Sequence, residues 1–250
     1  GSCTAVGHKA LEDYEGLFGI LGFATAVGHQ AAMNMTTPYH VTVVGYNAAS
    51  SATTGGTASV LIGSNAAASL TTGGGNTCVG HESLQSLTTA SNCVAIGKSA
   101  GDNITTGNNC IVIGDTADSS AASASNEVTL GNSSIATLRC NTQTISSLSD
   151  ARDKTDVQEL PEGLDFISKL NPVKFQWQTR DGNGKDGTYE AGFIAQELQS
   201  AQQDADADYL GLVMDSNPDR LEASYGKLVP MLVKAIQELK SEVEQLKANV

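Results

Sequence analysis

The sequence predicts a multi-domain protein, in which an all-β repeat rod is followed by an α+β domain that ends in a coiled-coil helix. Three observations predict this fold class. The first 148 of 250 residues hold 11 charged residues and 19 glycines, whereas the last 102 hold 30 charged residues. The first part repeats a short apolar run, and the last part ends in a heptad pattern. We therefore expect the rod at 1–148, the second domain at 149–250 and the coiled coil at 228–250.

The rod is predicted from eight short apolar runs that each end in glycine. From the fourth glycine onward the step is 17 residues, and the earlier steps are 21, 17 and 18 residues. Ala or Ser recurs three residues after most of these glycines, and a Thr-Thr pair recurs at the eighth and ninth positions. Several columns in one register indicate a repeat architecture. The glycines are Gly7, Gly28, Gly45, Gly63, Gly80, Gly97, Gly114 and Gly131.

Each repeat is predicted to be a small β unit. A β-branched run that ends in glycine is typical of a strand closed by a turn, and the "TTGG" and "TTGN" stretches predict a second turn. Seventeen residues leave room for about two short strands and two turns. Such a unit cannot bury a face alone, so it needs the neighbouring unit or a neighbouring chain.

Repeats of the type "NTCVGHESLQSLTTASNCVAIGKSAG" resemble the β-roll heads of trimeric autotransporter adhesins and the similar repeats of phage tail fibres. The resemblance covers about residues 3–134, although residues 10–27 depart from the pattern. It implies a trimeric rod, in which the units of each chain form part of the shaft.

Cysteine and histidine columns are interpreted as repeat positions. Cys93 and Cys110 each follow an asparagine and lie 17 residues apart, which favours small buried residues over a disulfide or a metal site. His8, His29 and His81 each follow a repeat glycine. In a trimer such a column could surround an ion, but an ordinary repeat column is the favoured interpretation. We expect no metal and no cofactor.

The second domain is predicted to mix short helices and strands. "LPEGLDFISKLNP" has apolar residues on one helical face and stops at "NP". "VKFQWQT" and "TYEAGF" alternate in polarity and predict two strands joined by the polar loop "RDGNGKDG". "IAQELQSAQQ" is typical of a helix, and "YLGLVM" is typical of a strand.

The C-terminal stretch is predicted to be a coiled-coil helix. Its apolar residues alternate three and four apart, as a heptad requires. Glu242 and Lys247 occupy g and e positions, where they can pair across chains. β-Branched residues at a with Leu at d are usual for dimers, but three heptads are too few to fix the number of chains. The heptad residues are Val229, Leu232, Ile236, Leu239, Val243, Leu246 and Val250.

Three motifs in order, "SDARDKTDV", "GFIAQEL" and "YGKLVPMLVKAIQEL", resemble the C-terminal intramolecular chaperone domain of phage tail spikes and fibres, the endosialidase-type self-cleaving serine peptidase. The resemblance implies a homotrimer that guides folding of the upstream fibre and then cuts itself off. Carried over by position, Ser149 is the nucleophile, Lys154 is its base, and Leu148-Ser149 is the scissile bond. It also implies a virion protein that is assembled in the host cytoplasm.

The residue types present agree with this chemistry. No histidine and no cysteine follow residue 148, so a Ser-His or Cys-His mechanism within the second domain is excluded. A lysine is the remaining common activator of a serine. Positions i and i+5 lie about 140° apart on a regular helix, so Ser149 and Lys154 cannot meet on one. The segment must form a turn, or the lysine must come from a neighbouring chain.

Charge limits the partners that the protein can bind. The formal net charge is −13, and an acidic surface repels phosphate and anionic lipid. We expect a homotrimer that binds no nucleic acid and does not insert into a membrane. The sequence leaves open whether the rod binds a host-surface receptor or glycan. The alternative function is a structural trimeric adhesin with a permanent, non-cleaving C-terminal trimerisation cap.

Overall fold

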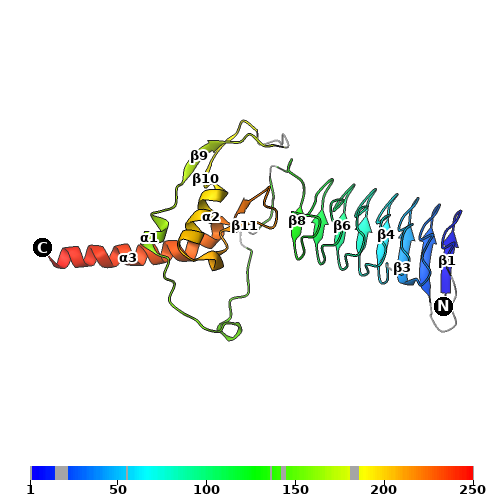
Figure 1. The fold of residues 1–250 in the computed structure, drawn as a ribbon, viewed down its shortest axis with the longest axis horizontal. Helices are drawn as coiled ribbons and strands as arrows, with labels where there is room; N and C mark the ends of the chain where they lie inside the picture. The colour runs from blue at the N-terminus through cyan, green and yellow to red at the C-terminus, as the bar shows by residue number, and fades with distance from the viewer. Residues whose placement is uncertain are drawn as a thin grey trace. The chain divides into compact units, whose positions relative to one another are not determined.

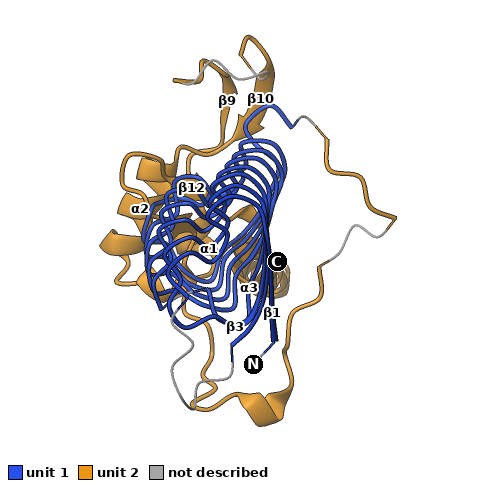
Figure 2. Ribbon diagram, turned by 90° about the vertical axis from the view of Figure 1, so that its right-hand side faces the viewer, with its two compact units in different colours: residues 1–135 blue, residues 136–250 orange. Residues whose placement is uncertain are grey.

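The computed structural model describes residues 2–14, 22–54, 56–135, 137–141, 145–180 and 186–249. The chain divides into two compact units, residues 1–135 and 136–250 (Figures 1 and 2). The first is a parallel β-solenoid, and the second combines short helices and strands with a long C-terminal helix. The predicted fold class is therefore confirmed.

One strand from each coil of the solenoid joins a single eight-stranded parallel sheet. The strand order follows the sequence from β1 to β8, so each coil contacts the coils just before and after it (Figure 1). The strands are β1 (Ser2–Val6), β2 (Phe23–Val27), β3 (Tyr39–Val44), β4 (Val60–Ile62), β5 (Thr77–Val79), β6 (Val94–Ile96), β7 (Ile111–Ile113) and β8 (Val128–Leu130).

The described coils each contain one strand, so the prediction of two strands in each repeat is wrong. The rest of the coil consists of turns that still hydrogen-bond to the next coil. The N–H of Ala67 donates to the carbonyl of Ser83 at 2.9 Å, for example. Asn65 and Ala67 have φ angles of 57° and 49°, in the left-handed region. These residues bend the chain two and four positions after Gly63, where a second strand would need extended backbone.

The solenoid core is built from columns of small and aliphatic side chains, one from each coil. Viewed along the stack, the coils of this unit nearly superimpose (Figure 2). The Ala and Ser column predicted from the sequence is buried from Ala48 to Ala117, and its first member, Ala10, is partly buried. A second column points inward from the strands and consists of Val43, Leu61, Cys78, Ala95 and Val112.

The repeat glycines are required by close contact between coils. A Cβ atom on Gly63 would lie 2.1 Å from the carbonyl oxygen of Gly80, and Gly63 has a φ of +139°. Only glycine adopts this conformation without strain, and only glycine leaves room for the next coil.

The second unit has a small helical core. The buried residues of its core cluster are Phe166, Leu212, Leu228 and Met231. Its helices and 3₁₀ turns are η1 (Ala151–Asp153), α1 (Leu164–Ile167), α2 (Ala195–Asp204), η2 (Asp208–Leu210), η3 (Tyr225–Leu228) and α3 (Val229–Ala248). Its strands are β9 (Val173–Gln176), β10 (Tyr189–Gly192), β11 (Val213–Met214) and β12 (Glu222–Ala223).

Most elements predicted for the second domain are present. Strands β9 and β10 form the expected antiparallel hairpin, of which loop residues 181–185 lie outside the described residues. Helices α2 and α3 also lie where the sequence predicts them. The strand predicted over "YLGLVM" is wrong in its first half, which is the turn η2. Gly211 ends this turn with a φ of 57°, so only Val213 and Met214 are extended.

Candidate functional site

The segment that contains the three predicted site residues is exposed and lies outside the core of either unit. Residues 145–149 and 151–159 are all exposed, and Asp150 is half-buried. The side chain of Leu148 is 81% accessible to solvent, which is unusual for leucine. The Leu148-Ser149 peptide therefore lies on open chain, where a bond can be cut without unfolding either compact unit.

Ser149 and Lys154 lie in direct contact within one chain. The Nζ atom of Lys154 donates a hydrogen bond of 2.7 Å to the Oγ atom of Ser149. The sequence left open whether the lysine comes from the same chain or from a neighbour, and this contact is intramolecular. To act as a base, the amine must be neutral and must accept the hydroxyl proton in the opposite direction.

A single 3₁₀ turn brings these two side chains together. Asp150 precedes the turn and caps it, because its Oδ1 atom accepts the backbone N–H of Arg152 at 2.9 Å. The N–H of Asp153 donates to the carbonyl of Asp150 at 3.1 Å. Lys154 is extended again, with φ −120° and ψ 138°. The chain thus turns between residues 150 and 153 and returns the lysine side chain to the serine.

Arg152 holds the capping carboxylate in place. Its Nε atom lies 3.0 Å from Oδ1 of Asp150, and its Nη2 atom lies 2.6 Å from Oδ2. This two-point hydrogen bond lowers the pKa of Asp150 and raises that of Arg152. Neither residue was predicted from the sequence to have a role. The sequence signal that could have predicted the cap is the aspartate at position 150. Asp side chains commonly accept a hydrogen bond from the backbone N–H two residues later.

The chain downstream of this turn is attached to the helices of the second unit. Glu159 forms an ion pair with Lys234 of α3. The hydroxyl of Tyr209 donates to the carboxylate of Glu162. Because of the hydrogen bond from Lys234, the pKa of Glu159 lies below its ordinary value. Residues after the turn are therefore anchored to α3, the helix with the heptad pattern.

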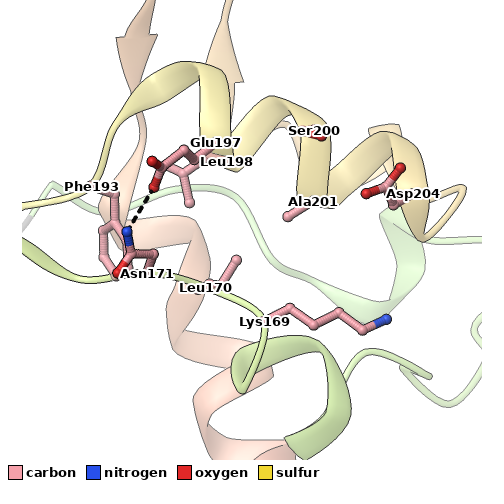
Figure 3. Close-up of a pocket in the computed structure, with 9 residues that line it drawn as sticks. All are labelled: Lys169, Leu170, Asn171, Phe193, Glu197, Leu198, Ser200, Ala201 and Asp204. Atoms are coloured by element: carbon pink, nitrogen blue, oxygen red, sulfur yellow. Dashed lines mark hydrogen bonds between the residues drawn. The ribbon is translucent and has the colours of Figure 1, made fainter.

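A hollow of about 390 Å³ lies elsewhere in this unit, beside α2 (Figure 3). Its floor is apolar, and Asn171 donates a hydrogen bond of 3.2 Å to Glu197 at its edge. Neither Ser149 nor Lys154 lines it. The residues that line it are Lys169, Leu170, Asn171, Phe193, Glu197, Leu198, Ser200, Ala201 and Asp204.

The cysteine columns lie in the solenoid core. Cys93 and Cys110 are buried, and their thiols donate to the carbonyls of Gly107 and Ala124, each at 3.3 Å. Burial raises the pKa of the Cys93 thiol, so the reactive thiolate form is disfavoured. The interpretation of Cys93 and Cys110 as small buried residues at one repeat position is confirmed.

The histidine column does not form a cluster. His8 and His29 stack with their ring centroids 5.0 Å apart, and Tyr46 stacks on His29. His81 lies further along the column, beyond Tyr46 and Ser64. Across the described ranges, no group of three metal-binding side chains is close enough to hold an ion. In the same part of the chain, no helix has the length and apolar character needed to span a bilayer.

Comparison with protein families supports the interpretation of the second half. Residues 149–207 match the family described as chaperone of endosialidase. The match begins at Ser149 and includes the first two sequence motifs, and the third motif lies beyond it. No curated protein and no solved structure matched the chain. The stretch from Ser149 to residue 207 is therefore similar to the chaperone-of-endosialidase family, as the sequence motifs predicted.

Proposed function

We propose that the protein is the C-terminal part of a phage tail fibre or spike. In this proposal residues 149–250 drive trimerisation and folding of the rod and then release themselves by cutting the Leu148-Ser149 bond. The observation that carries the proposal is the contact between Ser149 and Lys154 on exposed chain, at the first residue of the family match. Two further features of the structure support it.

Helix α3 has an unused apolar face. Leu228, Met231 and Ala235 are buried on one side of the helix. The heptad residues from Val229 to Leu246 lie on another side and are exposed, with Ile236 65% accessible and Leu246 67% accessible. An exposed heptad stripe is unfavourable on a lone helix and is the surface that a coiled coil buries. Two further copies of α3 are the proposed occupants of this stripe.

The solenoid sheet also has an apolar row on its outer face, half-buried from Val27 to Ile62 and exposed at its other members. One outward residue from each strand lies in register with the next, at a spacing of about 4.8 Å. We call this set the outer row; its members are Val6, Val27, Val44, Ile62, Val79, Ile96, Ile113 and Leu130. Three identical chains present rows of the same spacing, so their rods can pack side by side once the chains are in register.

The need to bring three rods into a common register explains why the fibre would require a chaperone. Parallel coils pair through contacts between residues 17 apart, but packing of three rods requires a common register. Unpaired rods would expose the outer row and aggregate while they search for it. A coiled coil at the C-terminus aligns the three chains first. Once the chaperone is released, an unfolded fibre cannot reassemble by the same pathway, so the folded fibre is kinetically trapped.

The proposed reaction transfers an acyl group and then adds water. Neutral Lys154 accepts the proton of Ser149 Oγ, and Oγ attacks the carbonyl carbon of Leu148. Backbone N–H groups stabilise the oxyanion. The C–N bond breaks, and Lys154 returns the proton to the amine of Ser149, which leaves an ester between Leu148 and Oγ. Water then hydrolyses this ester to the Leu148 carboxylate and the free serine hydroxyl.

Assembly is proposed to control this reaction. Lys154 is exposed in the single chain. Burial by a neighbouring chain favours the neutral form that the reaction needs. Cleavage would then follow trimer formation, so unassembled chains keep their chaperone.

A denaturing gel and mass spectrometry of the purified protein test the proposal. We expect fragments 1–148 and 149–250, and we expect Ser149→Ala and Lys154→Ala to yield only the full-length chain. Full-length chain in every case would favour the structural adhesin with a permanent cap.

Deletion of residues 149–250 tests the chaperone role separately. We expect the remaining rod to be insoluble or monomeric. A soluble trimer without those residues would contradict the chaperone role.

A further inference from the structure

The contact between Ser149 and Lys154 depends on a turn that the five-residue separation does not guarantee. A regular helix would place the two side chains about 140° apart, and an extended chain would place them about 17 Å apart. Only a tight reversal between them gives the observed 2.7 Å. The residues that fix this reversal therefore control how often the serine and the lysine meet.

Asp150 is the residue that fixes the reversal. Its Oδ1 atom accepts the N–H of Arg152 at 2.9 Å, and this is the side-chain cap of the turn. The remaining hydrogen bonds of the turn are longer, at 3.1 Å for Asp153 and 3.3 Å for Lys154. The segment has no buried residue that could hold its shape instead. The conformation thus depends on local hydrogen bonds, and the cap is the shortest of those that the backbone N–H groups of the turn donate.

Arg152 has a second effect on the same carboxylate. Its guanidinium contacts both oxygens of Asp150. This two-point contact fixes the orientation in which Oδ1 of Asp150 accepts the backbone N–H of Arg152.

We propose that Asp150 is a positioning residue for self-cleavage, and that Arg152 holds its carboxylate in the capping orientation. The inference rests on the proposed function, because it assigns a role in that reaction. It differs from a general role in stability, since the capped turn lies on exposed chain and contributes no side chain to the core.

The rate of self-cleavage of the full chain tests the proposal. Asp150→Ala removes the cap, and we expect the rate to fall about tenfold, the size typical of a lost helix cap. Asp150→Asn keeps an oxygen that accepts the N–H, so we expect it to cleave within about threefold of the unmodified chain. The cleavage rate of Arg152→Ala should lie between the rates of Asp150→Ala and Asp150→Asn. Asp153→Ala is the matched control, because it removes a carboxylate of the same turn that is not its cap, and it should cleave at the normal rate.

Several results would overturn the inference. They are a normal rate for Asp150→Ala, an Asp150→Asn rate as low as that of Asp150→Ala, or a rate for Arg152→Ala above that of the unmodified chain. Cleavage by Ser149→Ala would instead refute the proposed function and would leave the turn to be tested by another measurement.

Hydrogen exchange supplies that measurement. In the full chain with Ser149→Ala, the Arg152 amide should exchange faster after Asp150→Ala and at an unchanged rate after Asp150→Asn. Equal exchange in the three chains would show that Asp150 does not cap the turn. Oligomeric state and thermal midpoint should be the same in all variants, which separates positioning from folding.

Discussion

The carboxylate of Glu238 on α3 accepts a hydrogen bond of 2.6 Å from the backbone N–H of Leu164, 74 residues earlier in the sequence. Leu164 is the first residue of α1, and N–H groups in the first turn of a helix have no partner within it. Lys234 lies one turn before Glu238, at 3.8 Å, and pairs with Glu159. The helix that we propose to form the coiled coil therefore also holds the chain that follows the candidate cleavage site.

Glu238→Ala should destabilise the second unit. The substitution leaves the N–H of Leu164 without its charged acceptor, and we expect the free energy of unfolding to fall by about 1–2 kcal/mol. The single tryptophan, Trp177, lies in this unit, so its fluorescence during urea unfolding of the full chain reports the change. Gln237→Ala, at an exposed neighbouring position, is the control. Equal unfolding midpoints for the two variants would contradict the assigned role.

Polar substitutions on the exposed stripe of α3 should disrupt assembly but not the fold of the chain. Leu232 and Ile236 are exposed in the single chain, so replacing both with Asn removes no contact that the described structure shows. We expect a shift from trimer to monomer in sedimentation at micromolar concentration, with loss of cleavage. Gln237→Asn carries the same helix-propensity cost on a different side. A double variant that remains trimeric would show that the heptad stripe is not the interface.

The sequence predicted one face of α3 and missed the other. The heptad pattern identified the apolar residues that are exposed on α3. It did not identify the residues that pack against the rest of the second unit. The buried set of Leu228, Met231 and Ala235 follows the same spacing, shifted by one position. Periodicity by itself does not say whether an apolar residue faces its own domain or another chain. Both interpretations fit, and tertiary contacts decide between them.

Local backbone conformation explains the other differences. The repeat period could be predicted because the recurring glycines mark it directly in the sequence. The left-handed conformation of Ala67 gives no such signal, because alanine rarely adopts it, and so the second strand was predicted wrongly. At the candidate site, the motif resemblance singled out Ser149 and Lys154, whose side chains are in contact in the structure. The 3₁₀ turn was not predicted in detail, because its cap depends on the orientation of the Asp150 carboxylate.

The ion pair between Glu159 and Lys234 should make the second unit sensitive to pH. Because of the hydrogen bond between them, the pKa of Glu159 is lowered and that of Lys234 is raised. The contribution of Glu159 is present above about pH 4.3, the usual pKa of an unfolded Glu, and is lost as pH falls through its lower folded value. The contribution of Lys234 is present below about pH 10.4 and is lost as pH rises through its higher folded value.

Lys234→Met should therefore lower the urea midpoint at pH 7 and have a smaller effect at pH 3. Trp177 fluorescence at the two pH values measures the difference. Lys240→Met is the matched control, because Lys240 lies 3.7 Å from Glu244 on an exposed part of the same helix. It should leave the pH dependence unchanged. An equal loss of stability at pH 7 and pH 3 would mean that Lys234 acts through packing and not through charge.

Ser83→Ala should stabilise the solenoid. Ser83 occupies the column that holds alanine in the coils on either side, and its Oγ atom is buried without a hydrogen-bond partner among the described residues. An unsatisfied buried hydroxyl costs about 1–3 kcal/mol, so its removal should raise the free energy of unfolding by about 1 kcal/mol.

Asn76→Ala supplies the opposite case in the neighbouring coil. The buried Asn76 side chain donates to the carbonyl of Ala90 at 3.0 Å and accepts the N–H of Cys93 at 2.9 Å. Its removal leaves both groups unsatisfied, so we expect a loss of about 2–3 kcal/mol. Circular dichroism during denaturant unfolding measures both variants. If Ser83→Ala lowers the midpoint, the hydroxyl has a partner in the assembled rod, which would place that position at a contact between chains or at a bound water.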